Sequence, residues 1–93
     1  MINSFKSEET EQIFRGLFSR KLPQDIQRVA ACNLEQLHAA TILDTLRVAP
    51  GNRLEALTHA RQGQHSIRVN DQWRVCFVWR DGDAYDVEIV DYH

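Results

Sequence analysis

In one-letter code, residues 64–80 read QHSIRVNDQWRVCFVWR. From residue 73 onward the side chains alternate between two sets, as they do on the two faces of a β-strand. One set is apolar and consists of Trp73, Val75, Phe77 and Trp79. The other set carries two arginines and consists of Arg74, Cys76, Val78 and Arg80. Ile67 and Val69 alternate with Ser66 and Arg68 in the same way, and residues 70–72 between the two runs predict a tight turn. The stretch therefore predicts an antiparallel hairpin with one apolar face and one arginine-bearing face.

Further strands are expected on both sides of this hairpin. The period of two predicts strands near residues 53–58, 64–70, 73–80 and 84–91. Asp81-Gly82 predicts a type I′ turn before the last strand, so neighbouring strands are expected to be antiparallel. At the start of the chain, Ile2 to Phe5 are expected to form a short edge strand.

The first half of the chain has the period of a helix. Ser7 is expected to cap a first helix, in which Ile13, Phe14, Leu17 and Phe18 form one apolar stripe. Pro23 predicts the start of a second helix over 24–39, with a stripe of Ile26, Val29, Ala30, Leu34 and Leu37. Residues 40–48 predict a short helical turn before the breaker at 50–52. Two helices with one apolar stripe each have to cover the apolar face of the sheet, so an α+β domain with all helices on one side is expected.

Length and composition exclude several classes of protein. Ninety-three residues with 43% hydrophobic and 26% charged side chains are typical of one globular domain spanning 1–93. No apolar run approaches the roughly 18 residues of a membrane span, and the N-terminus lacks a stretch of signal-peptide length. Cys32 and Cys76 lie far apart and are interpreted as small core residues of a cytoplasmic protein.

The net charge of −2 conceals a segregation along the chain. Residues 47–80 contain six arginines and only two acidic residues, whereas residues 81–93 contain five acidic residues and no lysine or arginine. Arginine presents a planar fork that matches phosphate and stacks on bases. Two interpretations follow: a surface that binds nucleic acid, or a solvated face whose arginines pair with the acidic C-terminal strand.

Candidate catalytic residues lie on the arginine-bearing face and at the C-terminus. The chain ends in Asp91-Tyr92-His93, directly after a predicted strand, and Arg74 lies in the neighbouring strand. Cleavage of RNA needs a base for the 2′-hydroxyl, an acid for the leaving oxygen and cations for the phosphoryl charge. Histidine, tyrosine or a carboxylate can act as acid and base, and arginine can hold the phosphate. The histidines do not have the spacing of metal ligands, so no metal and no cofactor are predicted.

The same stretches resemble a known family. Residues 51–57 (GNRLEAL), 61–77 (RQGQHSIRVNDQWRVCF) and 86–93 (DVEIVDYH) closely resemble the HigB toxins of the RelE/ParE superfamily, from bacterial type II toxin–antitoxin systems. The resemblance implies a RelE-like fold: two helices and a short third helical turn packed on one face of a twisted antiparallel sheet. It also implies a ribosome-dependent mRNA endonuclease that works without metal through attack by the 2′-hydroxyl. By position, it implies catalytic roles for Arg74, Asp91, Tyr92 and His93, and contacts from Arg61 and Arg68 to RNA phosphate.

The resemblance further implies partners. These are a HigA-like helix-turn-helix antitoxin, mRNA in the ribosomal A site, and operator DNA bound only through the antitoxin complex. No membrane is implied, and the protein is expected in the cytoplasm. Glu55 stands where some members of the family carry a histidine, which makes it a candidate base. Two alternatives remain open: a gyrase-inhibiting toxin like those of the ParE branch, and a catalytically weak protein that binds the ribosome.

Overall fold

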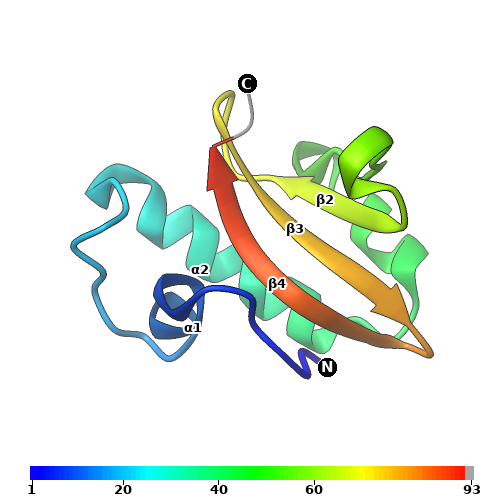
Figure 1. Cartoon of the computed structure of the whole chain (residues 1–93), viewed down its shortest axis with the longest axis horizontal. Helices are drawn as coiled ribbons and strands as arrows, with labels where there is room; N and C mark the ends of the chain where they lie inside the picture. Colours follow the sequence, from blue (N-terminus) through cyan, green and yellow to red (C-terminus); the bar gives the residue numbers. More distant parts are fainter. Residues whose placement is uncertain (92–93) are drawn as a thin grey trace.

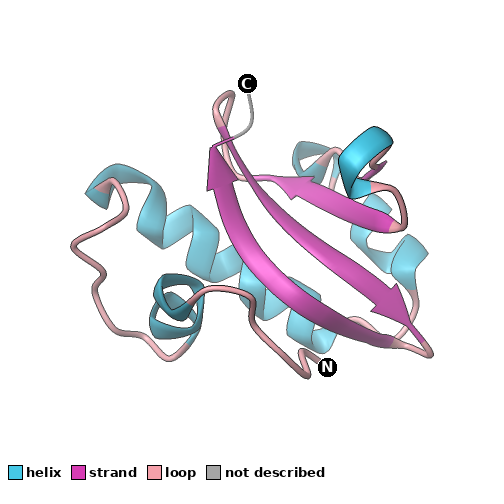
Figure 2. Cartoon of the chain, viewed as in Figure 1, coloured by secondary structure: helices cyan, strands magenta, loops and turns pink. Residues whose placement is uncertain are grey.

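The computed structural model describes residues 1–91, apart from the side chain of Pro50. It contains two α-helices, α1 (Glu8–Phe14) and α2 (Gln24–Ala39), followed by two 3₁₀ turns, η1 (Leu43–Arg47) and η2 (Pro50–Asn52). The sheet is formed by β1 (Glu55–Ala56), β2 (Gln64–Arg68), β3 (Trp73–Arg80) and β4 (Asp83–Asp91), with η3 (His59–Arg61) between β1 and β2. The strand order is β1-β2-β3-β4, and every pair is antiparallel. The twisted sheet has α2 behind it in the view of Figure 1. Figure 2 distinguishes the helices from the strands by colour in the same view.

The first helix is shorter than its apolar pattern predicts. The Ser7 hydroxyl accepts a hydrogen bond from the Thr10 amide, which caps α1 as expected. The helix ends at Phe14, because Gly16 adopts a left-handed φ of 82° that no helix can continue. Leu17 and Phe18 therefore lie outside the stripe, and each is 58% exposed. The prediction of a four-residue apolar stripe is wrong for these two positions.

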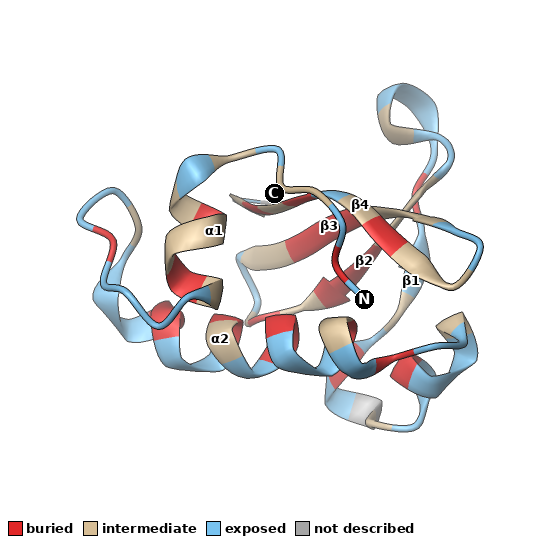
Figure 3. Ribbon diagram, turned by 90° about the horizontal axis from the view of Figure 1, so that it is seen from below, coloured by how far each residue is buried: buried red, intermediate tan, exposed pale blue. Residues whose placement is uncertain are grey.

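The second helix confirms the predicted range of 24–39. Pro23 immediately precedes it, and its buried face includes Ile26, Ala30, Leu34 and Leu37. Val29 is 45% exposed, so its predicted place in the stripe is wrong. Figure 3 shows α2 running beneath the sheet with its buried residues turned toward the strands. The helical turn expected within 40–48 is confirmed as η1.

The hairpin turns have the chemistry that their sequences predict. The Asn70 side-chain oxygen accepts hydrogen bonds from the backbone amides of Gln72 and Trp73, which closes the turn between β2 and β3. Asp81 and Gly82 both have positive φ, 54° and 80°, as a type I′ turn requires. The strand expected over 53–58 is reduced to β1, and the expected edge strand forms isolated parallel bridges from Ile2 and Phe5 to β4.

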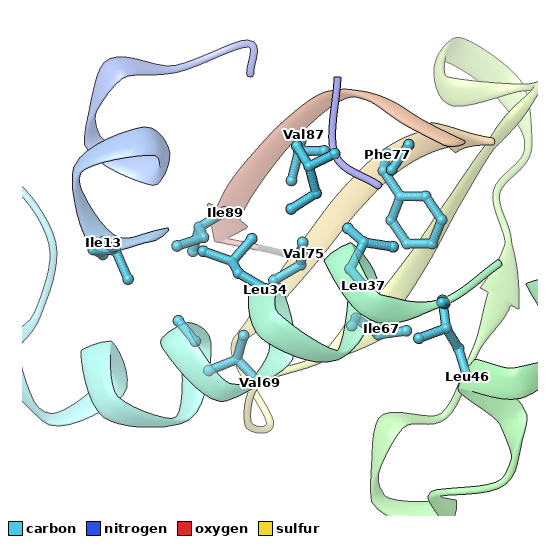
Figure 4. Packing of buried hydrophobic residues seen from close by; sticks show 14 of the residues in the cluster. Ile13, Leu34, Leu37, Leu46, Ile67, Val69, Val75, Phe77, Val87 and Ile89 are labelled. Carbon is cyan, nitrogen blue, oxygen red and sulfur yellow. The ribbon is translucent and has the colours of Figure 1, made fainter. Parts of the chain in front are cut away.

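The core lies between α2 and one face of the sheet (Figure 4). Val75 and Phe77 of β3 are fully buried there beside Leu34 and Leu37 of α2, and Trp73 and Trp79 pack against the same cluster. Burying a side chain of the size of phenylalanine or leucine contributes about 1.5–3 kcal/mol. The predicted apolar face of β3 is thus confirmed, as is the placement of the helices on one side of the sheet.

Two further expectations concern the cysteines and membrane insertion. Both cysteines are free; Cys76 is buried as expected, whereas Cys32 is exposed, so its prediction as a core residue is wrong. Within residues 1–91, no helix has both the length and the apolar character that crossing a bilayer demands.

Candidate functional site

The face of β2–β4 turned away from α2 carries a row of charged side chains. Strand pairing places Arg68 opposite Arg74, and Ser66 opposite both Glu55 and Cys76. Cys76 in turn pairs with Glu88 of β4. Since paired residues project from the same side of a sheet, these positions share one surface. We call Arg61, Arg68, Arg74, Glu55 and Glu88 the charged face.

Arg74 lies at the centre of this surface. Its Nε donates a hydrogen bond to the Ser66 hydroxyl at 2.6 Å, and its Nη2 donates to the Arg53 carbonyl at 2.6 Å. The same Nη2 lies 3.5 Å from Oε1 of Glu55. The side chain of Arg74 is only 11% exposed, whereas that of Glu55 is 52% exposed. The arrangement places a fixed guanidinium next to a carboxylate that water and ligands can reach.

Arg68 and Arg61 are the other two arginines of the charged face, and Arg68 is the residue paired with Arg74. Arg68 pairs with Asp71 in the turn between β2 and β3. Arg61, at the end of η3, donates from Nη1 to Oε1 of Glu88 at 2.9 Å. The side chains of Arg61 and Arg68 are 32% and 30% exposed. The face can present several cations to an anionic ligand.

Glu88 joins the N-terminal segment to this face. Its side chain is 15% exposed and lies 3.8 Å from Nζ of Lys6 in addition to its bond with Arg61. Arg61, Arg74, Lys6 and Glu88 all act electrostatically on the Cys76 thiol beneath them. Burial raises the pKa of this thiol, and Glu88 adds to that effect while the three cations oppose it. Cys76 is therefore a neutral thiol at physiological pH and forms part of the floor of the site.

The charged face is less bare than the sequence predicts. Ser66 and Cys76 are fully buried and Leu57 is 6% exposed, although strand alternation places all three on the side away from α2. The expectation of an entirely open face is thus wrong at its centre. The alternative that the arginines pair with the acidic C-terminal strand holds for Arg61, whereas Arg68 and Arg74 pair with carboxylates elsewhere.

The C-terminal candidates were expected to lie beside Arg74. Val90 is the residue that pairs with Arg74, and Asp91 pairs with Trp73. By alternation, the Asp91 side chain leaves the strand on the other side from Arg74, where its Oδ2 accepts a hydrogen bond from Nε2 of Gln72. For Asp91, the expectation of a side chain beside Arg74 is therefore wrong, because the strand register directs it to the opposite face of the sheet. Tyr92 and His93 lie outside the described residues.

Sequence reasoning missed four contributors to this surface. Strand alternation could have identified Ser66 and Glu88, because both occupy the face of Arg74. Lys6 and the carbonyl of Arg53 come from irregular segments, and no sequence signal assigns them. Within the part of the chain that is described, no three histidine, cysteine or acidic side chains are grouped as a metal site would need.

The fold matches solved structures of toxins in complex with antitoxins. Two structures of the YoeB–YefM complex from Staphylococcus aureus match with TM-scores of 0.57 and 0.54, at 14% identity over the whole of this chain and 98% of the other. The RelE-like α+β fold predicted from the sequence is thereby confirmed.

Sequence comparison identifies the family. A model described as the RelE-like toxin HigB of type II toxin–antitoxin systems matches residues 3–93, and the chain belongs to this HigB-like toxin family. Toxin HigB-1 of Vibrio cholerae serotype O1 is 40% identical over 90% of both chains. A protein named endoribonuclease HigB, from Proteus vulgaris, is 34% identical over the full length of both chains. The resemblance inferred from residues 51–57, 61–77 and 86–93 is confirmed.

Proposed function

We propose that this chain is the toxin of a type II toxin–antitoxin pair and that it cleaves mRNA on the ribosome, which arrests translation and growth. Family membership and the full-length likeness to an endoribonuclease support this activity. The single observation that carries the proposal is the Arg74 guanidinium, held rigidly beside the accessible carboxylate of Glu55. A fixed cation next to a carboxylate supplies two of the groups that metal-free RNA cleavage needs.

The proposed reaction is attack of the 2′-hydroxyl on the adjacent phosphate. The hydroxyl oxygen forms the new bond to phosphorus, a base takes its proton, and the bond to the 5′-oxygen breaks as that oxygen gains a proton from an acid. We assign Arg74 to the negative charge that develops on the phosphate. Of the C-terminal candidates, Asp91 projects from the face opposite Arg74, so Tyr92 and His93 are proposed as acid and base, and Glu55 is a further candidate base. A well-placed acid or base contributes roughly 10²- to 10⁴-fold.

Arg61 and Arg68 are proposed to bind the RNA backbone on either side of the reacting phosphate. Their guanidinium groups can exchange a carboxylate partner for a phosphate oxygen, because both anions match the same planar fork. The ribosomal A site would present the mRNA to this surface in the cytoplasm. No metal or cofactor takes part in the proposed reaction.

The proposed partner is a HigA-like helix-turn-helix antitoxin. The solved complexes that share the fold contain a toxin with its antitoxin, which supports a paired system here. Operator DNA is proposed to be bound through the antitoxin within the complex.

Expression of the chain in bacteria tests the proposed activity. Growth arrest should coincide with mRNA ends inside codons, measured by primer extension. The double substitution Arg74→Ala with His93→Ala should abolish both effects while the protein still accumulates. Intact mRNA in arrested cells, together with inhibition of gyrase supercoiling by the purified chain, would instead support the ParE-like alternative.

A catalytically weak protein is the second candidate, and Glu55 is the observation that favours it. This residue replaces a histidine of some family members and is engaged with Arg74. If the weak alternative holds, Glu55→His should raise the cleavage rate strongly. If Glu55 is the base, the same change should leave the rate equal or lower.

A further inference from the structure

The hydrogen bonds of Arg74 fix one side of its guanidinium and leave the other available. Nε and Nη2 together contact the Ser66 hydroxyl, the Arg53 carbonyl, the Ser66 carbonyl at 3.4 Å and the Glu55 carboxylate. Within residues 1–91, Nη1 has no hydrogen-bonding partner. A guanidinium carries five N–H donors in a rigid fork, so the two N–H groups of Nη1 are the ones that remain for a ligand.

Ser66 is suited to hold the guanidinium because it is itself immobile. It is fully buried in β2, with Glu55 of β1 on one side and Cys76 of β3 on the other. Its hydroxyl accepts the Nε hydrogen bond at 2.6 Å, which is short for a bond between nitrogen and oxygen. A buried hydroxyl in an inner strand therefore determines the direction of the Arg74 side chain.

The second acceptor, the Arg53 carbonyl, is held by a local backbone constraint. Arg53 has a φ of 44°, in the left-handed region that a residue with a side chain seldom adopts. The preceding Asn52 is 4% exposed, and its Nδ2 donates to Oε1 of Gln36 at 2.8 Å and to the Leu46 carbonyl at 3.1 Å. These contacts tie the turn to α2 and η1. Strained backbone of this kind persists where surrounding contacts enforce it, and it is frequent at functional sites.

We propose that Ser66 is a positioning residue for the reaction: with the Arg53 carbonyl, it locks the Arg74 guanidinium so that Nη1 faces the phosphate being cleaved. This inference rests on the proposed function of the chain. A donor that is already oriented loses no free energy to reorganisation when charge develops on the phosphate. Ser66 itself is buried beneath Arg74 and touches no substrate.

Single-turnover cleavage of an mRNA bound to purified ribosomes tests this role. Ser66→Ala should lower the cleavage rate about 10- to 100-fold, the size expected for a catalytic group displaced by about an ångström. The toxin concentration that gives half of the maximal rate should stay the same, because Arg61 and Arg68 still hold RNA. Ser66→Thr keeps the hydroxyl and should recover most of the rate. Ser19→Ala is the matched control, since Ser19 is also buried but lies in the loop between α1 and α2.

A double-mutant cycle separates positioning from a purely structural role. In an Arg74→Lys background, which has no Nε, Ser66→Ala should have no further effect on the rate. An equal loss in both backgrounds would overturn the proposal, and so would a Ser66→Ala protein that cleaves at the unchanged rate.

Hydrogen exchange at Nε gives a measurement that does not depend on cleavage. In ¹⁵N NMR spectra, the Arg74 Nε–H should exchange with water more slowly than that of the exposed Arg28, and Ser66→Ala should remove the difference. If the unaltered chain cleaves no mRNA, the proposed function fails, and this exchange measurement still decides whether Ser66 holds the guanidinium. Exchange unaffected by Ser66→Ala would refute the positioning role.

Discussion

Thr10 connects the first helix to the strand that leads into the C-terminal residues. It is fully buried, and its hydroxyl accepts a hydrogen bond from the Ile89 amide of β4 at 2.9 Å. The same hydroxyl lies 2.6 Å from that of Ser7, the capping residue of α1. The Thr10 hydroxyl therefore provides the partner for a backbone amide of β4, close to the segment that ends in Asp91.

Replacing Thr10 by valine keeps the shape of the side chain and removes these polar contacts. The buried Ile89 amide is left without a partner, which costs about 1–3 kcal/mol, and the lost contact with Ser7 adds about 1 kcal/mol. Burial of the additional methyl group offsets about 0.8 kcal/mol. We expect Thr10→Val to lower the free energy of unfolding by about 2 kcal/mol. For a domain of this size that corresponds to a fall in Tm of about 8–16 °C.

Urea unfolding followed by tryptophan fluorescence measures this change, with thermal unfolding as a second measurement. Thr58→Val is the matched control, because Thr58 is exposed and its hydroxyl does not cap η3. The control should stay within about 0.5 kcal/mol of the unaltered chain. A Thr10→Val protein as stable as the control would refute the reasoning that the hydroxyl satisfies a buried amide.

Three further predictions concern single side chains. Burial, and to a smaller degree the charge of Arg47, lowers the pKa of His65, so as the pH falls the unfolded chain takes up a proton at a higher pH than the folded chain does. The free energy of unfolding should therefore fall between pH 7 and 5 by more in the unaltered chain than in His65→Gln, as measured by urea titration at each pH. A thiol reagent at pH 8 should label the exposed Cys32 rapidly and the buried Cys76 only after denaturant is added, and rapid labelling of both would contradict the burial of Cys76. Gly82→Ala should destabilise the fold by about 1 kcal/mol or more, because Gly82 has a φ of 80° and a Cβ would lie 3.2 Å from a backbone carbonyl. Gly51→Ala is the control, because a Cβ there meets open space, and it should be nearly neutral when both variants are compared by thermal unfolding.

The sequence predicted the helices and strands best where local chemistry is strong. The range of α2, the alternation of β3 and the turn at Asp81-Gly82 all follow from patterns within a few residues. The failures at Leu17 and Phe18 have a local cause, the left-handed conformation of Gly16, which ends the helix although the apolar period continues. A periodic pattern does not reveal where a backbone turns.

The site was predicted only in part, because its contacts are made between distant segments. The sequence placed Arg74 on the face away from the helices, and strand pairing confirms that position. It could not show that the Arg53 carbonyl, in the turn before β1, and Glu55, in β1, approach Arg74, since the position of that turn depends on the hydrogen bond from Asn52 to Gln36 of α2. The catalytic roles of Arg74 and of the C-terminal residues stay predictions.

Cleavage of mRNA by purified components tests the central claim most directly. Ribosomes carrying a defined mRNA are mixed with the unaltered chain, with Arg74→Ala, or with Arg15→Ala, whose guanidinium pairs with Glu11 on α1. The unaltered chain and Arg15→Ala should cut the message inside the A-site codon at similar rates, and Arg74→Ala should be slower by about 100-fold or more. Equal cleavage by all three proteins, or an uncut message with the unaltered chain, would contradict the account.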